Sequence, residues 1–354
     1  MIRKILLLLE AGVLLAGLLL VFAAWQQHEA LHQPLRLGDE RLLEVPAGAT
    51  PGGVLNRLQA EGVLQDAFWL RLYWRFNLRG QPLHSGEYRL TPGQTVNDML
   101  VQWRRGDVVQ YSLTLVEGWN FRQVRAALER EAKLESSLAG LSDAQLMERL
   151  GLPGVNPEGR FFPDTYRYVR GTSDLDLLRQ AYARLERVLA EEWAGRAEGL
   201  PYGEPYEALI MASMIEKETG VPEERGAIAG VFVRRLRSGM RLQTDPTVIY
   251  GLGERYNGKL SRAHLREPTP YNTYVIDGMP PTPIALVGRE AIHAALHPVA
   301  GKSLYFVARG DGSHVFSETL EAHNRAVRAY QLNRRADYRS SPAPTQSSHQ
   351  KDAP

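Results

Sequence analysis

The sequence contains no cysteine among its 354 residues. This absence excludes disulfide bonds, catalysis by a thiolate, and zinc sites built from cysteine ligands. It is compatible with a compartment in which free thiols oxidise.

The sequence also lacks an excess of charge of either sign. It has 42 Lys and Arg residues against 40 Asp and Glu residues, which gives a net charge of +2. A protein that neutralises many phosphates needs a basic excess, so no nucleic-acid partner is expected. Neither a P-loop nor a Gly-x-Gly-x-x-Gly turn between a strand and a helix is present, and we predict no cofactor.

Charge is almost missing from the N-terminal segment that follows Arg3 and Lys4. Residues 5–24 include one ionisable side chain, Glu10, and a helix of this length spans about 30 Å, the thickness of a bilayer's hydrocarbon core. A secretory signal has a shorter apolar region, and basic residues before a span place the N-terminus inside. We therefore predict a cytoplasmic N-terminus (1–4), an uncleaved single-pass transmembrane anchor (5–25), a stalk (26–39), and all later residues outside the cytoplasm.

Three segments after the stalk share one pattern. Each has a short β-rich stretch, a turn glycine (Gly48, Gly93 and Gly118), and, two positions later, a residue that commonly caps a helix (Thr50, Thr95 and Asn120). The first two segments resemble the LysM pattern of glycan-binding modules, although Pro-Gly turns before Thr-capped helices are also common elsewhere. We expect an α+β fold with a LysM-like module over residues 40–135.

The rest of the chain is expected to be mainly helical, with an elaboration of strands and loops. Residues 141–200 are predicted to be mostly helical around an aromatic loop, 159–166. Two helices are expected within residues 205–238, then loops over 240–290. A β-hairpin around Gly310-Asp-Gly312 and a helix over Thr319 to Asn333 end the fold, and the Ser- and Pro-rich tail (335–354) is expected to be disordered.

The strongest candidate for chemistry is an apolar helix that ends in two carboxylates, Glu216 and Glu218. At 100° per residue, Glu218 falls in the centre of the apolar stripe that contains Met211 and Ile215, whereas Glu216 falls outside it. Burial favours the neutral form of a carboxyl group, which makes it a candidate general acid. We rank Glu218 first and Glu216 second; the alternative is that both carboxylates only solvate the helix end.

The loops over 240–290 combine amides, hydroxyls and aromatic rings, the mixture that binds sugars. Candidate substrate-binding residues are Gln243, Thr244, Asp245, Tyr250, Tyr271, Asn272 and Tyr274. Further rings are available from Tyr166, Tyr168 and Tyr256.

A competing constellation is a Glu-x-x-His-x-x-x-His run formed by Glu290, His293 and His297. Histidines four residues apart on a helix can chelate zinc. However, the run lacks the His-Glu-x-x-His order of zinc peptidases, and His297 directly precedes Pro298 at the helix end. The sequence therefore favours surface histidines, and we predict no metal site.

Several long motifs in the same order resemble those of the MltG (YceG-like) family of endolytic murein transglycosylases. They are residues 161–166 (Phe-Phe-Pro-Asp-Thr-Tyr), 211–219 (Met-Ala-Ser-Met-Ile-Glu-Lys-Glu-Thr), 239–251, 271–274 (Tyr-Asn-Thr-Tyr) and 278–281 (Gly-Met-Pro-Pro). The resemblance extends to about residue 334. It implies an anchor in the bacterial inner membrane, a LysM-like module, and a periplasmic catalytic domain over 136–334.

The resemblance also implies the reaction and its partners. The expected substrate is a peptidoglycan glycan strand, cut between N-acetylmuramic acid and N-acetylglucosamine without water to leave a 1,6-anhydro end, and peptidoglycan synthases are candidate partners. The family's catalytic glutamate falls on Glu218. Two alternatives remain: a two-carboxylate hydrolase that uses Asp245 as its second carboxylate, and a membrane-anchored scaffold that binds peptidoglycan without cleaving it.

Overall fold

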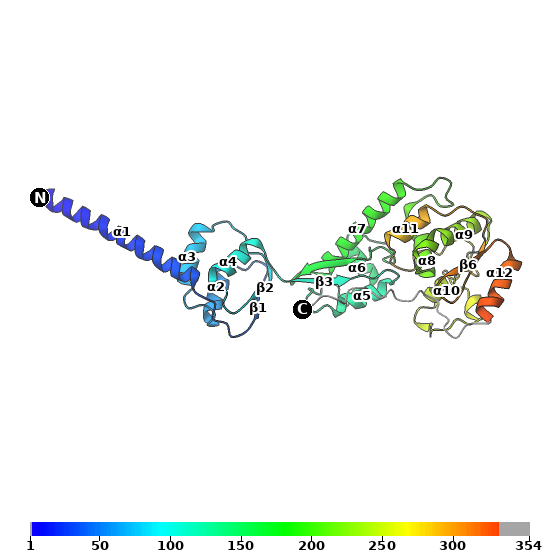
Figure 1. Ribbon diagram of the computed structural model, residues 1–354, viewed down its shortest axis with the longest axis horizontal. Helices are drawn as coiled ribbons and strands as arrows, with labels where there is room; N and C mark the ends of the chain where they lie inside the picture. The colour runs from blue at the N-terminus through cyan, green and yellow to red at the C-terminus, as the bar shows by residue number, and fades with distance from the viewer. Residues whose placement is uncertain (1, 333–354) are drawn as a thin grey trace. The chain divides into compact units, whose positions relative to one another are not determined.

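The computed structural model describes residues 2–332, which form a mixture of helices and short strands (Figure 1). The chain divides into two compact units. Unit 1 consists of Met1–Ser112, Ala132–Glu135 and Arg167–Ser173, and unit 2 consists of Leu113–Glu131, Ser136–Tyr166 and Asp174–Pro354. The tail predicted over 335–354 lies outside the described residues.

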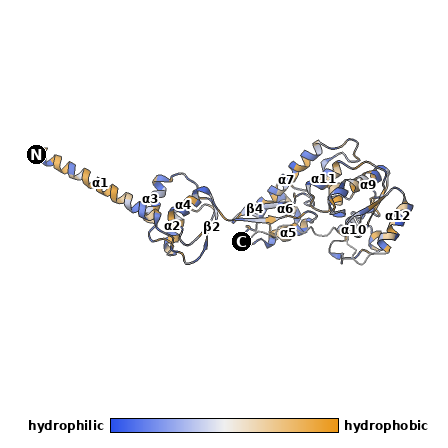
Figure 2. Ribbon diagram, viewed as in Figure 1, coloured by the Kyte–Doolittle hydropathy of each residue, from blue (hydrophilic) through white to orange (hydrophobic). Residues whose placement is uncertain are grey.

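The first element of unit 1 is helix α1 (Ile2–His32). Over most of its length, apolar residues lie on all sides of this helix (Figure 2). Its most apolar 18-residue window has a mean hydropathy of 2.7, so by length and composition α1 can cross a membrane. The helix continues into the predicted stalk, and beyond its end the Leu35 amide donates to the Gln94 carbonyl over 2.8 Å. The stalk residue Leu35 is therefore packed within unit 1 and not free.

The rest of unit 1 contains two of the three predicted strand–turn–helix segments. Strand β1 (Arg41–Val45) leads to α2 (Pro51–Ala60), and β2 (Gly86–Leu90) leads to α4 (Val96–Arg105). The hydroxyls of Thr50 and Thr95 cap these helices, as expected. The strands pair antiparallel, with Arg41 opposite Leu90 and Val45 opposite Gly86. Helix α3 (Phe68–Asn77) completes a core whose largest fully buried side chains include Trp103, Tyr88, Leu55 and Leu58.

A buried carboxylate holds the three segments of unit 1 together. Glu87 on β2 is 4% exposed, and its carboxylate accepts hydrogen bonds from Tyr111 and Lys133 and pairs with Arg170. Burial acts to raise the pKa of Glu87, but these donors outweigh it and leave the pKa below its usual value. The cluster is therefore a structural ion pair and not a proton donor.

The third strand–turn–helix segment belongs mostly to unit 2. Strand β3 (Gln110–Thr114) is followed by Gly118 and by helix α5 (Phe121–Arg130), which Asn120 caps. Strand β3 pairs with β4 (Thr165–Val169), a strand that the helical expectation for this region missed. Tyr166 and Tyr168 lie on β4 and are only 6% and 4% exposed, so the expectation that they offer rings to a sugar is wrong.

The core of unit 2 is built around helix α8 (Pro205–Glu218), which packs against four other helices. These are α7 (Asp174–Ala194), α9 (Arg225–Arg237), α10 (Asp245–Leu252) and α11 (Arg289–Leu296). Every residue of α8 from Ala208 to Ile215 is buried. One polar side chain in that stretch, Ser213, donates to the Ile210 carbonyl and accepts from the Ile284 amide, which satisfies it.

Shorter elements complete unit 2. They are α6 (Asp143–Arg149), the 3-10 turns Pro222–Glu224, Gly253–Arg255 and His264–Arg266, the antiparallel strands β5 (Tyr305–Ala308) and β6 (His314–Ser317), α12 (Leu320–Val327), and a π-helical turn, Arg328–Leu332. The predicted hairpin and the helix start at Thr319 are confirmed. Asn333, where that helix was expected to end, lies outside the described residues. The expectation of loops over 240–290 missed α10, whose first turn contains Pro246, a favoured position for proline.

Candidate active site

The final residue of α8 is Glu218, and the helix stops there because Thr219 adopts an extended backbone with φ −140°. Glu218 therefore extends from the end of a largely buried helix of unit 2. Eight consecutive residues of that helix, from Ala208 to Ile215, are buried and hold the helix that carries Glu218 in place.

The carboxylate of Glu218 accepts one hydrogen bond, from the hydroxyl of Thr244, with 3.2 Å between Oγ1 and Oε1. Burial, and after it the negative charge of Asp245, raises the pKa of Glu218, whereas the Thr244 hydrogen bond lowers it; together they bring the pKa to about 8. At neutral pH the group is therefore mostly protonated. A neutral carboxyl group can donate a proton to a leaving oxygen.

Asp245 and Tyr274 form a second pair next to Glu218. The Tyr274 hydroxyl donates to Oδ1 of Asp245 over 2.7 Å. Burial, followed by the charge of Asp245, raises the pKa of Tyr274, so it remains a neutral donor. Asp245 itself is exposed at the first turn of α10. The pair therefore fixes a negative charge close enough to influence Glu218.

Gln243 has an unusual backbone. Its φ of +52° is the only positive value at a non-glycine position among residues 2–332. Such conformations cost about 1 kcal/mol or more and persist where surrounding contacts impose them. Here the Gln243 amide donates to the Thr273 carbonyl, and its side chain accepts from the buried guanidinium of Arg235 over 3.3 Å. The turn directs Thr244 toward Glu218.

Asn272 lies in this region but is fully engaged by its own loop. It is 1% exposed; its amide nitrogen donates to the carbonyls of His264 and Glu267, and its oxygen accepts from the Tyr274 amide. These contacts satisfy the hydrogen-bonding groups of the side chain. Asn272 is therefore better placed to hold Tyr274 in position than to bind a sugar.

Tyr250 and Tyr271 form a separate aromatic pair, with ring centroids 4.7 Å apart at 59°. The Tyr271 hydroxyl shares a hydrogen bond of 2.9 Å with Thr282. The seven residues predicted to bind substrate therefore fall into three groups. Thr244, Asp245 and Tyr274 lie around Glu218, and Gln243 and Asn272 support them. The third group is Tyr250, on α10, with Tyr271 packed against it.

A second buried acid, Glu158, was not among the site residues predicted from the sequence. It is 5% exposed; its carboxylate accepts from the Phe121 amide at 3.0 and 3.2 Å and from the Tyr250 hydroxyl at 2.9 Å. Burial raises its pKa to about 7, although these hydrogen bonds act in the opposite direction. Its place immediately before the aromatic loop that begins at Gly159 was the available signal.

A cleft of about 970 Å³ runs beside Glu158 and Tyr250. Its walls are the start of α5 (Asn120 to Gln123), the loop over 154–158, and α10 (Pro246, Ile249 and Tyr250). Lys217 and Pro246, the chain neighbours of Glu218 and Asp245, line it, whereas Glu218 and Asp245 do not. The cleft is thus next to the acid and large enough for part of a polymer.

Glu216, the second candidate, is also buried, with a side chain that is 7% exposed. Burial and the charge of Glu117 raise its pKa. Its Oε2 accepts from the Gly288 amide over 3.2 Å, and Arg225 lies 4.0 Å from its Oε1. These partners anchor the loop before α11, away from the Thr244, Asp245 and Tyr274 group.

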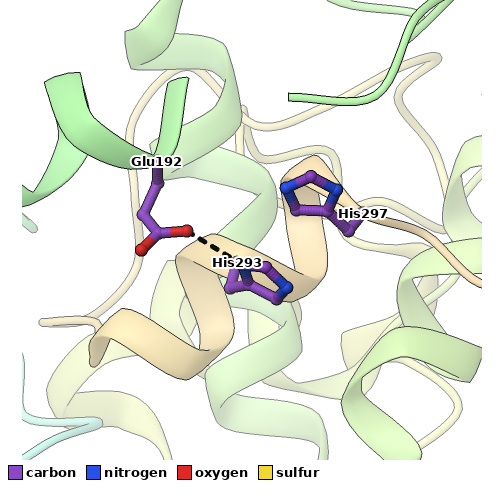
Figure 3. Close-up of side chains that lie close together, drawn as sticks. All are labelled: Glu192, His293 and His297. Atoms are coloured by element: carbon purple, nitrogen blue, oxygen red, sulfur yellow. Dashed lines mark hydrogen bonds and ion pairs between the residues drawn. The ribbon is translucent and has the colours of Figure 1, made fainter. Parts of the chain in front are cut away.

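The structure brings together a different set of possible metal ligands from the run Glu290, His293 and His297. The carboxylate near His293 and His297 comes from Glu192 on α7 and not from Glu290, and one ligand atom from each of the three residues lies within 4.8 Å of the others (Figure 3). Such a set could hold a divalent cation. Glu192 is already paired with Arg289 at 2.8 Å and with His293 at 2.9 Å, so polar partners account for its position.

Comparison with known proteins places the whole arrangement in a family. Residues 43–329 match the sequence profile of the YceG-like family. The chain belongs to the YceG-like family. The match begins within β1 and ends just after α12, so it includes parts of both units and contains Glu218.

YceG-like relatives are similar over most of the chain. An endolytic murein transglycosylase from Bacillus subtilis is 28% identical over 305 residues, covering 81% of this chain and 84% of that protein. An endolytic murein transglycosylase from Streptococcus pneumoniae is 24% identical and covers 80% of this chain, which spans 57% of that relative's length. The crystal structure of a YceG-like protein from Listeria monocytogenes, 29% identical, superimposes with a TM-score of 0.53 over 82% of this chain and 99% of that one.

Proposed function

We propose that this protein is an endolytic murein transglycosylase that cuts within glycan strands, between N-acetylmuramic acid and N-acetylglucosamine, and leaves 1,6-anhydro ends. The observation that carries the proposal is the placement of Glu218 at the end of a buried helix, with Thr244 as its hydrogen-bond donor and the charge of Asp245 nearby, a setting that raises the pKa of its carboxyl group to about 8. The similarity of the chain to murein transglycosylases supports the substrate class.

Neutral Glu218 would act first as a general acid. Its proton passes to the glycosidic oxygen while the bond from that oxygen to C1 of the muramic acid breaks. Positive charge develops on the sugar ring, and the fixed negative charge of Asp245 near the acid stabilises it. The Tyr274 hydroxyl holds Asp245 in place for this role.

The Glu218 carboxylate would then act as the base. It takes the proton from the C6 hydroxyl of the same muramic acid, whose oxygen closes onto C1 to form the anhydro ring. One carboxyl group is enough for both proton transfers, and it ends the cycle protonated. Thr244 supports the anionic state between the two steps by donating to Oε1.

The cleft beside Tyr250 would hold the strand. Aromatic rings offer flat faces to sugar C–H groups, and the Tyr250–Tyr271 pair supplies such faces along α10. Glu158 fixes the Tyr250 hydroxyl and the start of α5, on two sides of the cleft. We assign Glu158 as a positioning residue for Tyr250.

Anchoring would keep the enzyme close to newly made strands. Helix α1 is compatible with a membrane anchor, and Arg3 and Lys4 at its N-terminal end support an inside N-terminus with both units in the periplasm. In unit 1, the strand–turn–helix segments at Gly48 and Gly93 support a LysM-like glycan-binding role. Peptidoglycan synthases are the proposed protein partners.

Mass spectrometry of uncrosslinked glycan strands tests the function directly. The full chain in detergent should produce internal cuts that end in 1,6-anhydromuramic acid, and Glu218→Gln should produce almost none in the same time. Reducing ends would show that water attacks and would favour the hydrolase with Asp245. Strands that bind but stay intact with the wild type would favour a scaffold.

A further inference from the structure

Unit 2 has a second hollow, which Tyr274 helps to line. Its volume is about 500 Å³, and it is lined by Arg241, Arg262, Leu265, Arg266, Tyr274 and Val275. Three of its six lining residues carry a permanent positive charge. No residue of the cleft beside Tyr250 lines it, so the two are separate sites.

Two of the arginines are available to a ligand. Arg262 and Arg266 lie four residues apart, both side chains are exposed, and neither forms an ion pair among residues 2–332. Arg241 pairs with Asp277 over 3.0 Å, and Asp277 is itself largely exposed. The neighbouring acid Glu267 is engaged by Arg255 over 2.6 Å. The hollow therefore keeps an excess of two positive charges.

The hollow and the proposed acid share Tyr274. Arg241 Nη1 donates to the Tyr274 carbonyl over 3.1 Å, while the Tyr274 hydroxyl donates to Asp245. A group bound by the arginines would thus lie beside Tyr274, whose hydroxyl donates to Asp245, the residue that influences Glu218. Guanidinium groups suit carboxylates because they offer two parallel donors.

We propose that the arginines bind a free carboxylate of the peptide stem attached to the muramic acid at the scissile bond. The inference rests on the proposed function, since murein strands carry peptides on their muramic acids. Binding of the stem would draw the sugar into register with Glu218. The site would make the enzyme prefer strands whose stems keep their negative charge.

The test compares the full-length protein in detergent with its Arg262→Gln/Arg266→Gln variant on two preparations of uncrosslinked strands. One has free stem carboxylates, and in the other these are converted chemically to amides. A charge-assisted pair is worth about tenfold or more. We expect kcat/KM of the wild type to be about tenfold lower on amidated strands than on free ones. The variant should cleave both preparations with the same kcat/KM, equal to that of the wild type on amidated strands.

Two controls separate the proposal from general charge loss. Arg130→Gln/Arg187→Gln removes two exposed arginines outside both hollows and should keep the wild-type preference. Strands stripped of their stems should be cleaved equally by wild type and Arg262→Gln/Arg266→Gln. A loss on stripped strands as large as on free stems would assign the arginines to the glycan itself and overturn the proposal.

The remaining outcomes distinguish a failure of the proposed stem site from a failure of the proposed function. Equal cleavage of free and amidated strands by the wild type rejects the stem site while the proposed function stands. If the wild type cleaves none of the preparations, the proposed function fails and the stem site fails with it. Matching melting curves of the variant and the wild type confirm that the exposed substitutions leave the fold intact.

Discussion

The hydroxyl of Thr244 donates to Oε1 of Glu218, while the next residue in the chain, Asp245, raises the pKa of the same carboxyl group. The two neighbours act in opposite directions because one stabilises the carboxylate by a hydrogen bond and the other opposes it by charge. Both lie at the start of α10. The first turn of this helix therefore tunes the proposed acid.

The first prediction concerns the alkaline limb of the pH profile. Glu218 must be protonated to act, so kcat/KM should fall as the pH rises through about 8. Thr244→Val removes the bond that favours the carboxylate, which should move the limb to higher pH. Asp245→Asn removes the opposing charge, which should move the limb to lower pH. Rates measured from pH 5 to 10 report both shifts.

Product analysis of Asp245→Asn adds a second check to the same experiment. A lytic enzyme that uses Glu218 alone should still form anhydro ends, at a reduced rate. Complete loss of cleavage with a wild-type fold would instead indicate that Asp245 is an essential second carboxylate. If the alkaline limb moved in the same direction in Thr244→Val and in Asp245→Asn, the assignment of that limb to Glu218 would be contradicted.

A second prediction links the same carboxyl group to stability. Its pKa is about 8 when folded, against 4.5 for a free side chain, so the native state binds a proton that the unfolded state has lost. Folding stability should therefore decrease as the pH rises from about 5 to about 8. At 1.36 kcal/mol per pKa unit, the cost reaches at most about 5 kcal/mol.

Glu218→Gln should remove this pH dependence. We expect the variant to melt several degrees above the wild type at pH 8 and at nearly the same temperature at pH 5. Glu186→Gln, an exposed change on α7, is the matched control and should leave both temperatures unchanged. A variant that melts below the wild type at pH 8 would show that the carboxyl group is stabilising when ionised.

The local architecture was largely predictable because its signals are local. The glycine turns, the caps at Thr50, Thr95 and Asn120, and the start of α12 at Thr319 all depend on residues within one helical turn. Strand β4 was missed because its pairing with β3 comes from a segment about fifty residues away. Short strands receive their stability from such distant partners.

The site was predictable in part. A helical wheel assumes one buried face, but α8 is buried all around, so both Glu216 and Glu218 lose hydration. The helical wheel alone therefore cannot decide which glutamate is the acid. The residues that contact each carboxylate, Thr244 for Glu218 and Gly288 for Glu216, distinguish the two. Glu158 could not be found from periodicity because its burial depends on α5 and α10, which lie far from it in sequence.

A third prediction separates the two carboxylates of α8. Glu218→Gln should lower kcat by about 10²- to 10⁴-fold, the usual contribution of general acid–base catalysis. Glu216→Gln keeps an acceptor for the Gly288 amide and should change kcat by less than about tenfold. Single-turnover cleavage of isolated strands measures both. Equal losses in the two variants would reject the ranking.

A fourth prediction concerns Glu158, which we assign to positioning and not to proton transfer. Glu158→Gln keeps an acceptor for the Phe121 amide and the Tyr250 hydroxyl, whereas Glu158→Ala leaves both buried donors unpaired. We expect the Gln variant to raise KM by about three- to tenfold with kcat nearly unchanged, because the ring of Tyr250 would be held less firmly in the cleft. The Ala variant should also lose stability, by about 1–3 kcal/mol.

Tyr250→Phe is the matched control, since it keeps the ring beside Tyr271 and removes the hydroxyl that donates to Glu158. If Glu158 acts through Tyr250, combining Tyr250→Phe with Glu158→Gln should raise KM no more than either change alone, as expected for residues that share one interaction. A loss of kcat in Glu158→Gln as large as that in Glu218→Gln would contradict the positioning role. It would show that the second buried acid exchanges protons with the substrate.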